Sequence, residues 1–262
     1  MSIKFLYDRQ KTAITYGEQK ISYADVIKYV NFYSDFLDIE KGDRSAFMME
    51  NRPESIFSFF SIWAKKGIAI SLDAGYTVDQ LAYVLGDSEP KYLFVSNKTK
   101  EVAEAANSKL NNAVKIINVD EIDLPTDYKI KQEEFTNDSN KDVAVLVYTS
   151  GTTGNPKGVM ITYENIETNM AGVRAVDLVN ENDVILAMLP YHHIMPLCFT
   201  LILPMYMGVP IVLLTEISSA TLLKTLQENR VTVILGVPRV WEMLDKAIMT
   251  KINQSSLAKF MF

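Results

Sequence analysis

Apolar residues in this chain occur in two patterns, short unbroken runs and longer stretches with helical spacing. The runs Val143–Val147 and Val184–Leu189 have no polar alternation, which is typical of strands buried on both faces of a parallel sheet. Between them, Ile166, Met170 and Val173 recur at helical intervals and predict a helix. In this half of the chain we expect strands at Val143–Val147, Val184–Leu189, Pro210–Leu214 and Val231–Leu235, and helices at Tyr163–Val176, Ile194–Tyr206, Ala220–Glu228 and Arg239–Ile252.

In the first half of the chain, predicted strands and helices alternate in the same way. The stretch Asp120–Lys141 is rich in Asp, Glu, Asn and Lys and is interpreted as an exposed connection. The predicted fold is therefore α/β, with two mainly parallel sheets and flanking helices, in subdomains of residues 1–141 and 142–262. Here we expect strands at Ser45–Met49, Ile68–Leu72, Tyr92–Val95 and Val114–Val119, and helices at Ile21–Leu37, Pro53–Lys65, Val78–Leu85 and Lys98–Leu110.

Composition narrows the classes of function. The chain has 262 residues, of which 48% are hydrophobic and 22% charged, as in soluble globular proteins. A net charge of −6 argues against a nucleic-acid partner bound through its phosphates. The single cysteine, Cys198, fits a reducing, cytoplasmic setting, and we expect it in the core.

Two segments of the sequence decide whether an export signal or a membrane-spanning helix is expected. The N-terminal residues contain no apolar core of an export signal. Ile194–Leu214 has no charged residue and is long enough to span a bilayer, but three prolines and a glycine divide it. We interpret it as a buried helix followed by a buried strand. Peripheral membrane contact and homodimer formation stay open.

The string VYTSGTTGNPKG, Val147–Gly158, is unlike any regular element. It follows an expected strand and precedes an expected helix, and ligands of open α/β sheets bind where strands end. Gly151, Gly154 and Gly158 permit positive φ and close backbone approach to an anion. The hydroxyl residues of the string add hydrogen-bond donors, and Lys157 adds a positive charge. A chain of phosphates is the ligand that suits such a loop.

This string is not a Walker loop, because its lysine follows the preceding glycine after two residues. A glycine-rich surface turn is the plain alternative, and the complete string after an apolar strand disfavours it. YTSGTTGNPKG instead resembles, almost letter for letter, the phosphate-loop signature of the adenylate-forming enzymes, which include acyl-CoA synthetases, firefly luciferases and peptide-synthetase adenylation domains. Further segments resemble that family in the same order: ISYADVIKYV, GDRSAFMMENRPE, GIAISLDAGYTVDQLAYVLGDSEPKYLFVSN and LPYHHIMP.

The resemblance implies a two-step reaction. A carboxylate and ATP with Mg²⁺ give an acyl adenylate and pyrophosphate, and in the synthetases the thiol of CoA then takes the acyl group. The resemblance implies that Thr149 contacts Mg²⁺ and that Lys157, counted with the catalytic residues, steadies the departing pyrophosphate. The residues implied to surround the β- and γ-phosphates are Ser150, Gly151, Thr152, Thr153 and Gly154.

His192 and His193 are adjacent in the sequence. Neighbouring side chains diverge on a helix or a strand, so the two histidines are a poor metal pair. The resemblance implies that His193 lies against the acyl carboxylate and the α-phosphate, as a catalytic and substrate-binding residue. The alternative is a histidine at a helix start that makes a local hydrogen bond. His192 is expected to be a neighbour only.

The segment GVPRVW, Gly236–Trp241, follows an expected strand and so shares the edge with the phosphate loop. It resembles a segment that is most associated with the long-chain branch of the family. Together with the uncharged wall Ile194–Leu214, this implies that Val237 and Trp241 line a pocket for a long-chain fatty acid. The alternative is a helix whose apolar face packs on the sheet.

Several family segments are not found in these 262 residues. They are the YGxTE stretch, the ribose-binding GR..D aspartate and the lid domain with its catalytic lysine. We therefore expect the N-terminal body of an acid–thiol ligase, inactive by itself, which activates a long-chain fatty acid to an acyl adenylate and then to acyl-CoA. Two alternatives are an adenylation domain that loads a carrier protein and a nucleotide-binding module without catalysis.

Overall fold

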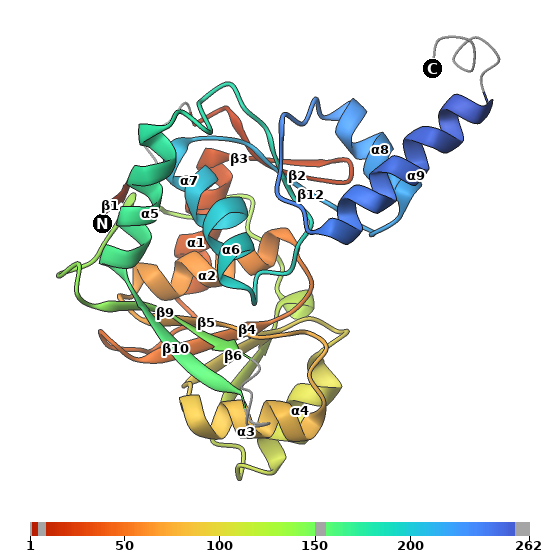
Figure 1. The fold of residues 1–262 in the computed structure, drawn as a ribbon. Helices are drawn as coiled ribbons and strands as arrows, with labels where there is room; N and C mark the ends of the chain where they lie inside the picture. The colour runs from red at the N-terminus through yellow and green to blue at the C-terminus, as the bar shows by residue number, and fades with distance from the viewer. Residues whose placement is uncertain (1, 5–8, 150–155, 255–262) are drawn as a thin grey trace.

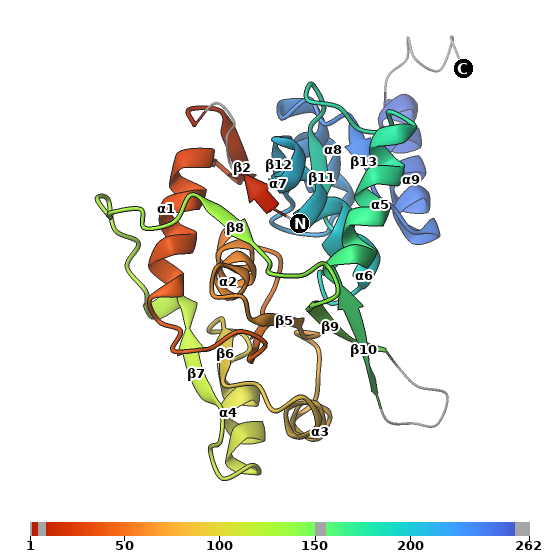
Figure 2. The ribbon, with the colours of Figure 1, turned by 90° about the vertical axis from the view of Figure 1, so that its left-hand side faces the viewer.

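A computed structural model describes residues 2–4, 9–149 and 156–254 of the chain (Figure 1). Within these residues the largest sheet contains β4 (Arg44–Met48), β5 (Ile68–Ser71), β6 (Tyr92–Val95), β7 (Lys115–Asn118), β9 (Val143–Thr149) and β10 (Lys157–Thr162). Their order is β10-β9-β5-β4-β6-β7. Neighbouring strands from β9 to β7 are parallel, whereas β10 lies at the edge, antiparallel to β9 (Figure 2).

A second sheet combines strands that are far apart in the sequence. It contains β2 (Thr12–Tyr16), β3 (Gln19–Ser22), β11 (Ile185–Ala187), β12 (Ile211–Leu213) and β13 (Val233–Ile234). Their order is β13-β11-β12-β2-β3, and all neighbours are parallel except the hairpin β2–β3. The prediction of two mainly parallel sheets is confirmed, although the sequence pattern did not reveal the short hairpin.

The helices lie between the two sheets and on their outer faces. The central layer contains α1 (Tyr23–Ser34), α2 (Pro53–Ala64), α5 (Tyr163–Ala175) and a helical run formed by α6 (Ile194–Pro196), the π-helical segment η2 (Leu197–Ile202) and α7 (Leu203–Met207). The outer face of the six-stranded sheet carries α3 (Val78–Ser88) and α4 (Lys100–Ser108), which Figure 1 shows below it.

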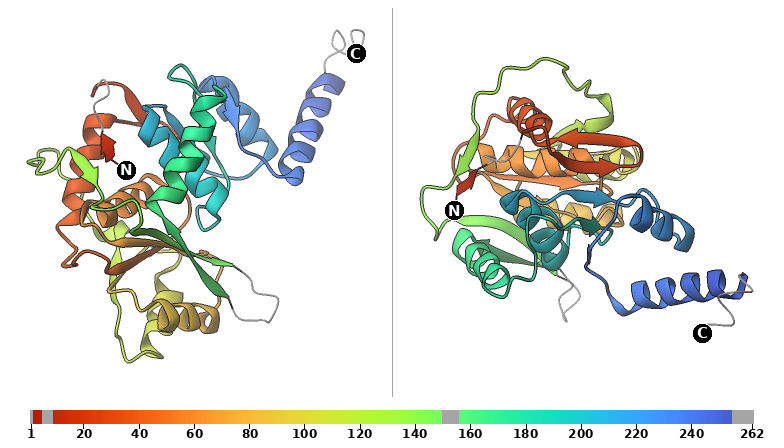
Figure 3. Two further views of the ribbon diagram at one scale, coloured as in Figure 1. Left: turned by 60° about the vertical axis from the view of Figure 1, so that its left-hand side comes forward. Right: turned by 90° about the horizontal axis from the view of Figure 1, so that it is seen from above.

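The outer face of the five-stranded sheet is covered by α8 (Ser219–Glu228) and the first part of α9 (Pro238–Gln254). Figure 3 shows the rest of α9 extending away from the body of the protein. Two small elements complete the described fold: an antiparallel ribbon of β1 (Ser2–Lys4) with β8 (Glu134–Thr136), and a 3-10 turn, η1 (Val119–Glu121).

Successive side chains of the central strands alternate between two hydrophobic clusters. In β4, Phe47 packs in the central layer, whereas Ala46 and Met48 pack against α3 and α4. In β11, Ile185 belongs to the central cluster and Leu186 to the cluster under α8 and α9. Strands covered on both faces need apolar residues at every position, which explains the unbroken apolar runs of the sequence.

The structure around the phosphate loop differs from two expectations, namely the element that follows the loop and the role of Gly158. The edge strand β10 separates the loop from α5, which was expected to follow the loop directly. Gly158 lies within β10 and is not among the described glycines with positive φ. Space around it is tight instead, because a Cβ there would lie 3.1 Å from Leu146 Cδ1 and 3.3 Å from Tyr148 Cζ, and these side chains would have to shift by a few tenths of an ångström. The strand was missed because its residues are mostly exposed and carry no burial pattern.

The uncharged segment Ile194–Leu214 forms a helix and a strand, as predicted. The helical run ends at Gly208, whose φ of 71° caps it, and β12 follows. Cys198 is buried in this run, and burial raises the pKa of its thiol to about 12. Among the residues that the structure describes, no helix is both long and apolar enough to cross a membrane.

Each sheet contains strands from both sides of residue 142. β9 and β10 complete the first sheet, and β2 and β3 complete the second. A division into residues 1–141 and 142–262 therefore does not follow sheet membership and stays a proposal.

Trp63 of α2 joins the central layer to β9. Its indole Nε1 donates a hydrogen bond to the carbonyl oxygen of Ala144 at 2.9 Å. Its ring lies 5.1 Å from the ring of Tyr163, at the start of α5. Because β9 ends at Thr149, this contact helps to hold the strand that leads into the phosphate loop.

Candidate active site at the carboxyl ends of the two sheets

A pocket of about 510 Å³ opens where strands of both sheets end. Its wall combines Asp73, which follows β5, Tyr148 of β9 and the histidine pair that follows β11. Ligands of open α/β sheets commonly bind at this position. The residues that line the pocket are Asp73, Gly75, Tyr76, Asp79, Gln80, Tyr83, Tyr148, Pro156, His192 and His193.

Thr149 and Lys157 are cross-strand partners at the base of the phosphate loop. The register pairs the last residue of β9 with the first residue of β10, and both residues are exposed. Side chains that are directly opposite in an antiparallel pair are about 5 Å apart at Cβ and share one face. A hydroxyl and a positive charge are therefore available to the same ligand. The remaining predicted loop residues, Ser150, Gly151, Thr152, Thr153 and Gly154, lie outside the described residues.

Tyr148 anchors the end of β9 to α3. Its hydroxyl donates a hydrogen bond to Asp87 Oδ2 at 2.5 Å. Burial and this acidic partner raise the pKa of the Tyr148 hydroxyl, so that it remains a protonated donor at neutral pH. The residue after Tyr148 is Thr149, and the bond to Asp87 consequently restrains the position at which the phosphate loop begins.

The two histidine rings are in tilted contact at the start of the helical run. Their ring centroids are 4.1 Å apart, with 55° between the ring planes. His192 is half-buried, with Nδ1 3.7 Å from Asp73 Oδ1, whereas His193 is exposed. Burial lowers the pKa of His192, Asp73 opposes that shift and His193 adds to it. The net pKa lies below its ordinary value, so His192 is mainly neutral at pH 7.

A smaller cavity of about 220 Å³ adjoins the main pocket and shares Asp73 and His192 with it. Its wall includes Glu50, which follows β4. Burial raises the pKa of this carboxyl group, but hydrogen bonds from its own backbone and from Ser96 and the charges of Lys98 and Arg52 bring it below the ordinary value. This cavity therefore carries an ionised, internally bonded carboxylate.

Arg52 organises the charges beside that cavity. Its guanidinium lies 2.6 Å from Glu54 Oε2 and 2.8 Å from Asp120 Oδ1. Burial alone raises the pKa of the Asp120 carboxyl, but the backbone N–H of Asn97 and the charge of Arg52 lower it below its ordinary value. This network joins the start of α2 to η1 and stabilises the edge on which the pocket is built.

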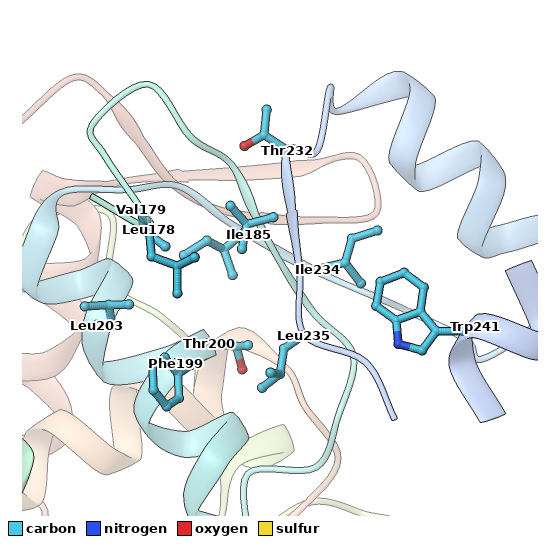
Figure 4. A pocket seen from close by; sticks show the side chains of 11 residues that line it. Leu178, Val179, Ile185, Phe199, Thr200, Leu203, Thr232, Ile234, Leu235 and Trp241 are labelled. Atoms are coloured by element: carbon cyan, nitrogen blue, oxygen red, sulfur yellow. The ribbon is translucent and has the colours of Figure 1, made fainter. Parts of the chain in front are cut away.

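The predicted acyl-pocket residues lie elsewhere on the second sheet. Trp241 lines a separate, mainly apolar pocket of about 460 Å³. Figure 4 shows Phe199 and Thr200 on one side of this pocket and the indole of Trp241 beside Ile234 on the other. The other residues that line it are Leu178, Val179, Ile185, Leu203, Thr232, Val233 and Leu235.

Val237 does not line this pocket, although it was predicted beside Trp241; it is 46% exposed. The structure thus brings His193 together with Tyr148 and Pro156, which flank the phosphate loop, whereas Thr149 and Lys157 are not among the residues that line this pocket. It places Trp241 at a second site. Sequence reasoning missed Asp73 and Tyr148. Their positions in the sequence could have indicated both residues, because each lies just after the end of an expected strand, where ligand sites form.

Comparison with known proteins identifies the family. The family model described as AMP-binding enzyme matches residues 7–261. The chain belongs to the AMP-binding enzymes. The resemblance of the phosphate loop to the adenylate-forming enzymes is thereby confirmed, and with it the general class of the protein as a relative of acyl-CoA and aryl-CoA ligases.

The AMP-binding relatives act on different acids. The chain is 25% identical over 276 residues to the long-chain-fatty-acid–CoA ligase of Bacillus subtilis, covering 88% of this chain and 48% of the relative. It is 31% identical over 205 residues to the 2-succinylbenzoate–CoA ligase of Bacillus velezensis, covering 78% of this chain and 40% of the relative. The chain thus spans about half of the length of the curated relatives that it matches, or less.

Solved structures of AMP-binding enzymes show the same fold. ATP-bound MatB from Rhodopseudomonas palustris superimposes with a TM-score of 0.80 at 24% identity, covering 93% of this chain and 51% of that protein. The predicted fold, the body of an adenylate-forming enzyme, is therefore confirmed.

Proposed function

We propose that the chain forms the phosphate-binding and acyl-binding body of an ATP-dependent acid–thiol ligase that converts a long-chain fatty acid to an acyl adenylate and then to acyl-CoA. Family membership supports the ligase class. One observation carries the choice of a fatty acid, namely that the apolar pocket is walled by the helical run that begins after His193.

The acyl chain follows this helical run in the proposal. Phe199 and Thr200 come six and seven residues after His193, within the π-helical part of the same helical run. We propose that the carboxylate binds at His193 and that the tail extends along this run into the apolar pocket, which is lined by other residues. Its volume of about 460 Å³ lies within the range of about 300–1,000 Å³ that is typical of pockets for small molecules.

The first step is a displacement at the α-phosphorus of ATP. A carboxylate oxygen forms the new bond to phosphorus, and the bond to the bridging oxygen breaks, so that pyrophosphate leaves with that electron pair. Negative charge grows on the leaving group. The hydroxyl of Thr149 and the ammonium group of Lys157, side by side at the base of the loop, would stabilise that charge.

His193 acts as a donor in this step. We propose that its imidazole donates a hydrogen bond to the α-phosphate or to the acyl carboxylate, which holds the two reacting groups in line. The helix start does not use the ring, because His193 makes no side-chain capping hydrogen bond there. The proposed role requires no proton transfer to or from the imidazole.

Magnesium accompanies the nucleotide in the proposal. When bound, the ion supplies positive charge to the phosphates. Thr149 is the described residue that is proposed to contact it. Mg²⁺ usually takes most of its ligands from phosphates and water.

The thiol of CoA is the proposed acceptor in the second step. The thiol loses its proton to solvent, its sulfur bonds to the carbonyl carbon of the adenylate, and the bond from that carbon to the phosphate oxygen breaks, so that AMP leaves with the electron pair. The relatives named above are CoA ligases, which supports CoA over a carrier protein. Residues 1–262 by themselves are proposed to form no acyl-CoA, since the segments that the family uses for ribose binding and for the lid are not among them.

A chain-length series in the complete enzyme tests the substrate. Each methylene buried in the pocket contributes about 0.8 kcal/mol, or about fourfold in kcat/KM. We expect kcat/KM to rise from acetate through octanoate to palmitate, below micellar concentrations and at fixed ATP and CoA. Trp241→Arg should shift the preference to shorter acids. A flat profile, or a maximum at acetate or an aromatic acid such as succinylbenzoate, would remove the fatty-acid assignment and leave adenylation standing.

A further inference from the structure

The proposed site is divided between the two sheets. The phosphate loop is attached to β9 and β10 of the six-stranded sheet, whereas His193 follows β11 of the five-stranded sheet. In-line attack requires the acyl carboxylate and the α-phosphate to meet in one geometry. The geometry of the site therefore depends on contacts that tie the carboxyl edge of one sheet to that of the other.

The first such contact is made by Asn51, which follows β4. Its side-chain Nδ2 donates a hydrogen bond of 2.8 Å to the carbonyl oxygen of Leu189, which follows β11. The two residues are 138 positions apart in the sequence. Leu189 begins the short turn to His193, in which the backbone N–H of His193 donates to the carbonyl oxygen of Pro190 at 3.3 Å.

The second contact reaches the same turn at its other end. Asp73, which follows β5, presents Oδ1 at 3.7 Å from His192 Nδ1. This distance is longer than a hydrogen bond, so the carboxylate acts on the ring through its charge. The carboxylate is itself held by its loop, because the same Oδ1 accepts a 2.8 Å hydrogen bond from the backbone N–H of Gly75. The ring of His192 in turn contacts the ring of His193 in a tilted arrangement, with 4.1 Å between the centroids.

We propose that Asn51 and Asp73 are positioning residues, which set His193 against the phosphate loop by fixing the turn Leu189–His192 from the opposite sheet. This inference rests on the proposed function. Neither residue needs to touch a substrate to act in this way. A misplacement of about 1 Å in an active site can cost up to about a hundredfold in rate, so loss of either contact is expected to lower kcat without a matching change in the KM for ATP.

The first experiment requires no catalytic activity. The sequence contains two histidines, His192 and His193, so the proton NMR spectrum of the imidazole Hε1 atoms contains two assignable signals. We expect Asn51→Asp, which places an oxygen against the Leu189 carbonyl, to move both signals. Asn169→Asp is the matched control, because Asn169 also donates from Nδ2 to a carbonyl oxygen, that of Asn165 on the exposed face of α5. It should leave both signals in place.

The second experiment measures kcat and the KM for ATP in the complete enzyme. Asn51→Asp is expected to lower kcat by about ten- to a hundredfold and to change the KM for ATP less than threefold, as judged from the cost of misplacement. In a His193→Ala background the same substitution should have little further effect on kcat, because the residue that it positions is gone. Asn51→Ala, which removes the donor without introducing a charge, is the second variant if the aspartate variant fails to fold.

The outcomes separate the two proposals. Signals that stay in place in Asn51→Asp and Asn51→Ala, or a kcat loss that persists in full without His193, would overturn the positioning role. A wild-type enzyme that releases no pyrophosphate from ATP with any carboxylic acid would overturn the proposed function. Moved histidine signals in such a protein would still support the tie between the two sheets.

Discussion

Replacing Trp63 with phenylalanine tests whether α2 holds the strand that leads into the phosphate loop. The indole is 2% exposed, and its Nε1 donates at 2.9 Å to the carbonyl oxygen of Ala144 in β9. The ring also lies 4.6 Å from the ring of Phe59 and 5.1 Å from that of Tyr163. Phenylalanine keeps an aromatic ring in the cluster, but it has no N–H group and fills less space.

We expect Trp63→Phe to lower the free energy of unfolding by about 2–4 kcal/mol. A buried carbonyl group that loses its partner costs about 1–3 kcal/mol. The smaller ring adds a packing loss, which we take as about 1 kcal/mol because complete truncation of a buried aromatic residue costs about 3–5 kcal/mol. For a chain of this size, about 1 kcal/mol shifts Tm by about 2–4 °C, so Tm should fall by about 5–15 °C.

Urea unfolding, followed by circular dichroism, measures the change. The chain contains two tryptophans, and Trp241→Phe is the natural control because that side chain is 50% exposed. We expect the control to change the free energy of unfolding by less than about 0.5 kcal/mol. Equal losses in the two variants, or a loss below about 0.5 kcal/mol in Trp63→Phe, would refute the reasoning that the indole hydrogen bond fastens β9.

Three further predictions concern the charges of the site. In the complete enzyme, Thr149→Ala should lower kcat about 10²–10³-fold and raise the KM for ATP much less, because charge is stabilised mainly in the transition state; half the normal rate at saturating Mg-ATP would contradict the assignment. Asp73→Asn should lower the pKa of His192 further below its ordinary value, since the carboxylate raises it, and an NMR titration with an unchanged midpoint would exclude that contact. Arg52→Gln should lower the free energy of unfolding by about 1–3 kcal/mol at pH 7. Folding lowers the pKa of Asp120, so its ion pair with Arg52 stabilises the folded state above about pH 4, and this contribution is lost as the pH falls through the folded pKa. Denaturant titrations should therefore show a difference in the free energy of unfolding between variant and wild type at pH 7 that disappears at pH 2.

The pattern of apolar residues was sufficient to predict those helices and strands whose side chains are buried in a regular order. Tyr92–Val95 is buried along its whole length and was predicted with its observed bounds, and α2 begins at Pro53 as its proline indicates. The edge strand β10 was missed because exposed residues need no apolar pattern to pair. The periodicity of apolar residues indicates which side chains are buried. It does not predict a strand that is held mainly by backbone hydrogen bonds.

The candidate site was only partly accessible to sequence reasoning for a related reason. The phosphate loop and His193 are contiguous motifs, and both could be found by inspection of the sequence. The contacts that arrange them join residues that are far apart, such as Asn51 with Leu189 and Trp63 with Ala144. No periodicity predicts which asparagine reaches which carbonyl oxygen. The separation of Trp241 from His193 likewise depends on where α9 packs relative to β11, which the sequence alone does not show.

The order of strands in the second sheet has a consequence for synthesis on the ribosome. β2 is made early, but it pairs in parallel with β12, and the partners Ile14 and Ile211 are separated by about 200 residues of chain. At about 5–20 residues per second, the hairpin β2–β3 is exposed for about 10–40 s before its partner strand emerges. During this interval the edge of β2 that pairs with β12 in the finished protein lacks its backbone partner. We therefore expect the nascent chain to engage holding chaperones at its first hairpin, and that engagement to end once β12 has left the exit tunnel.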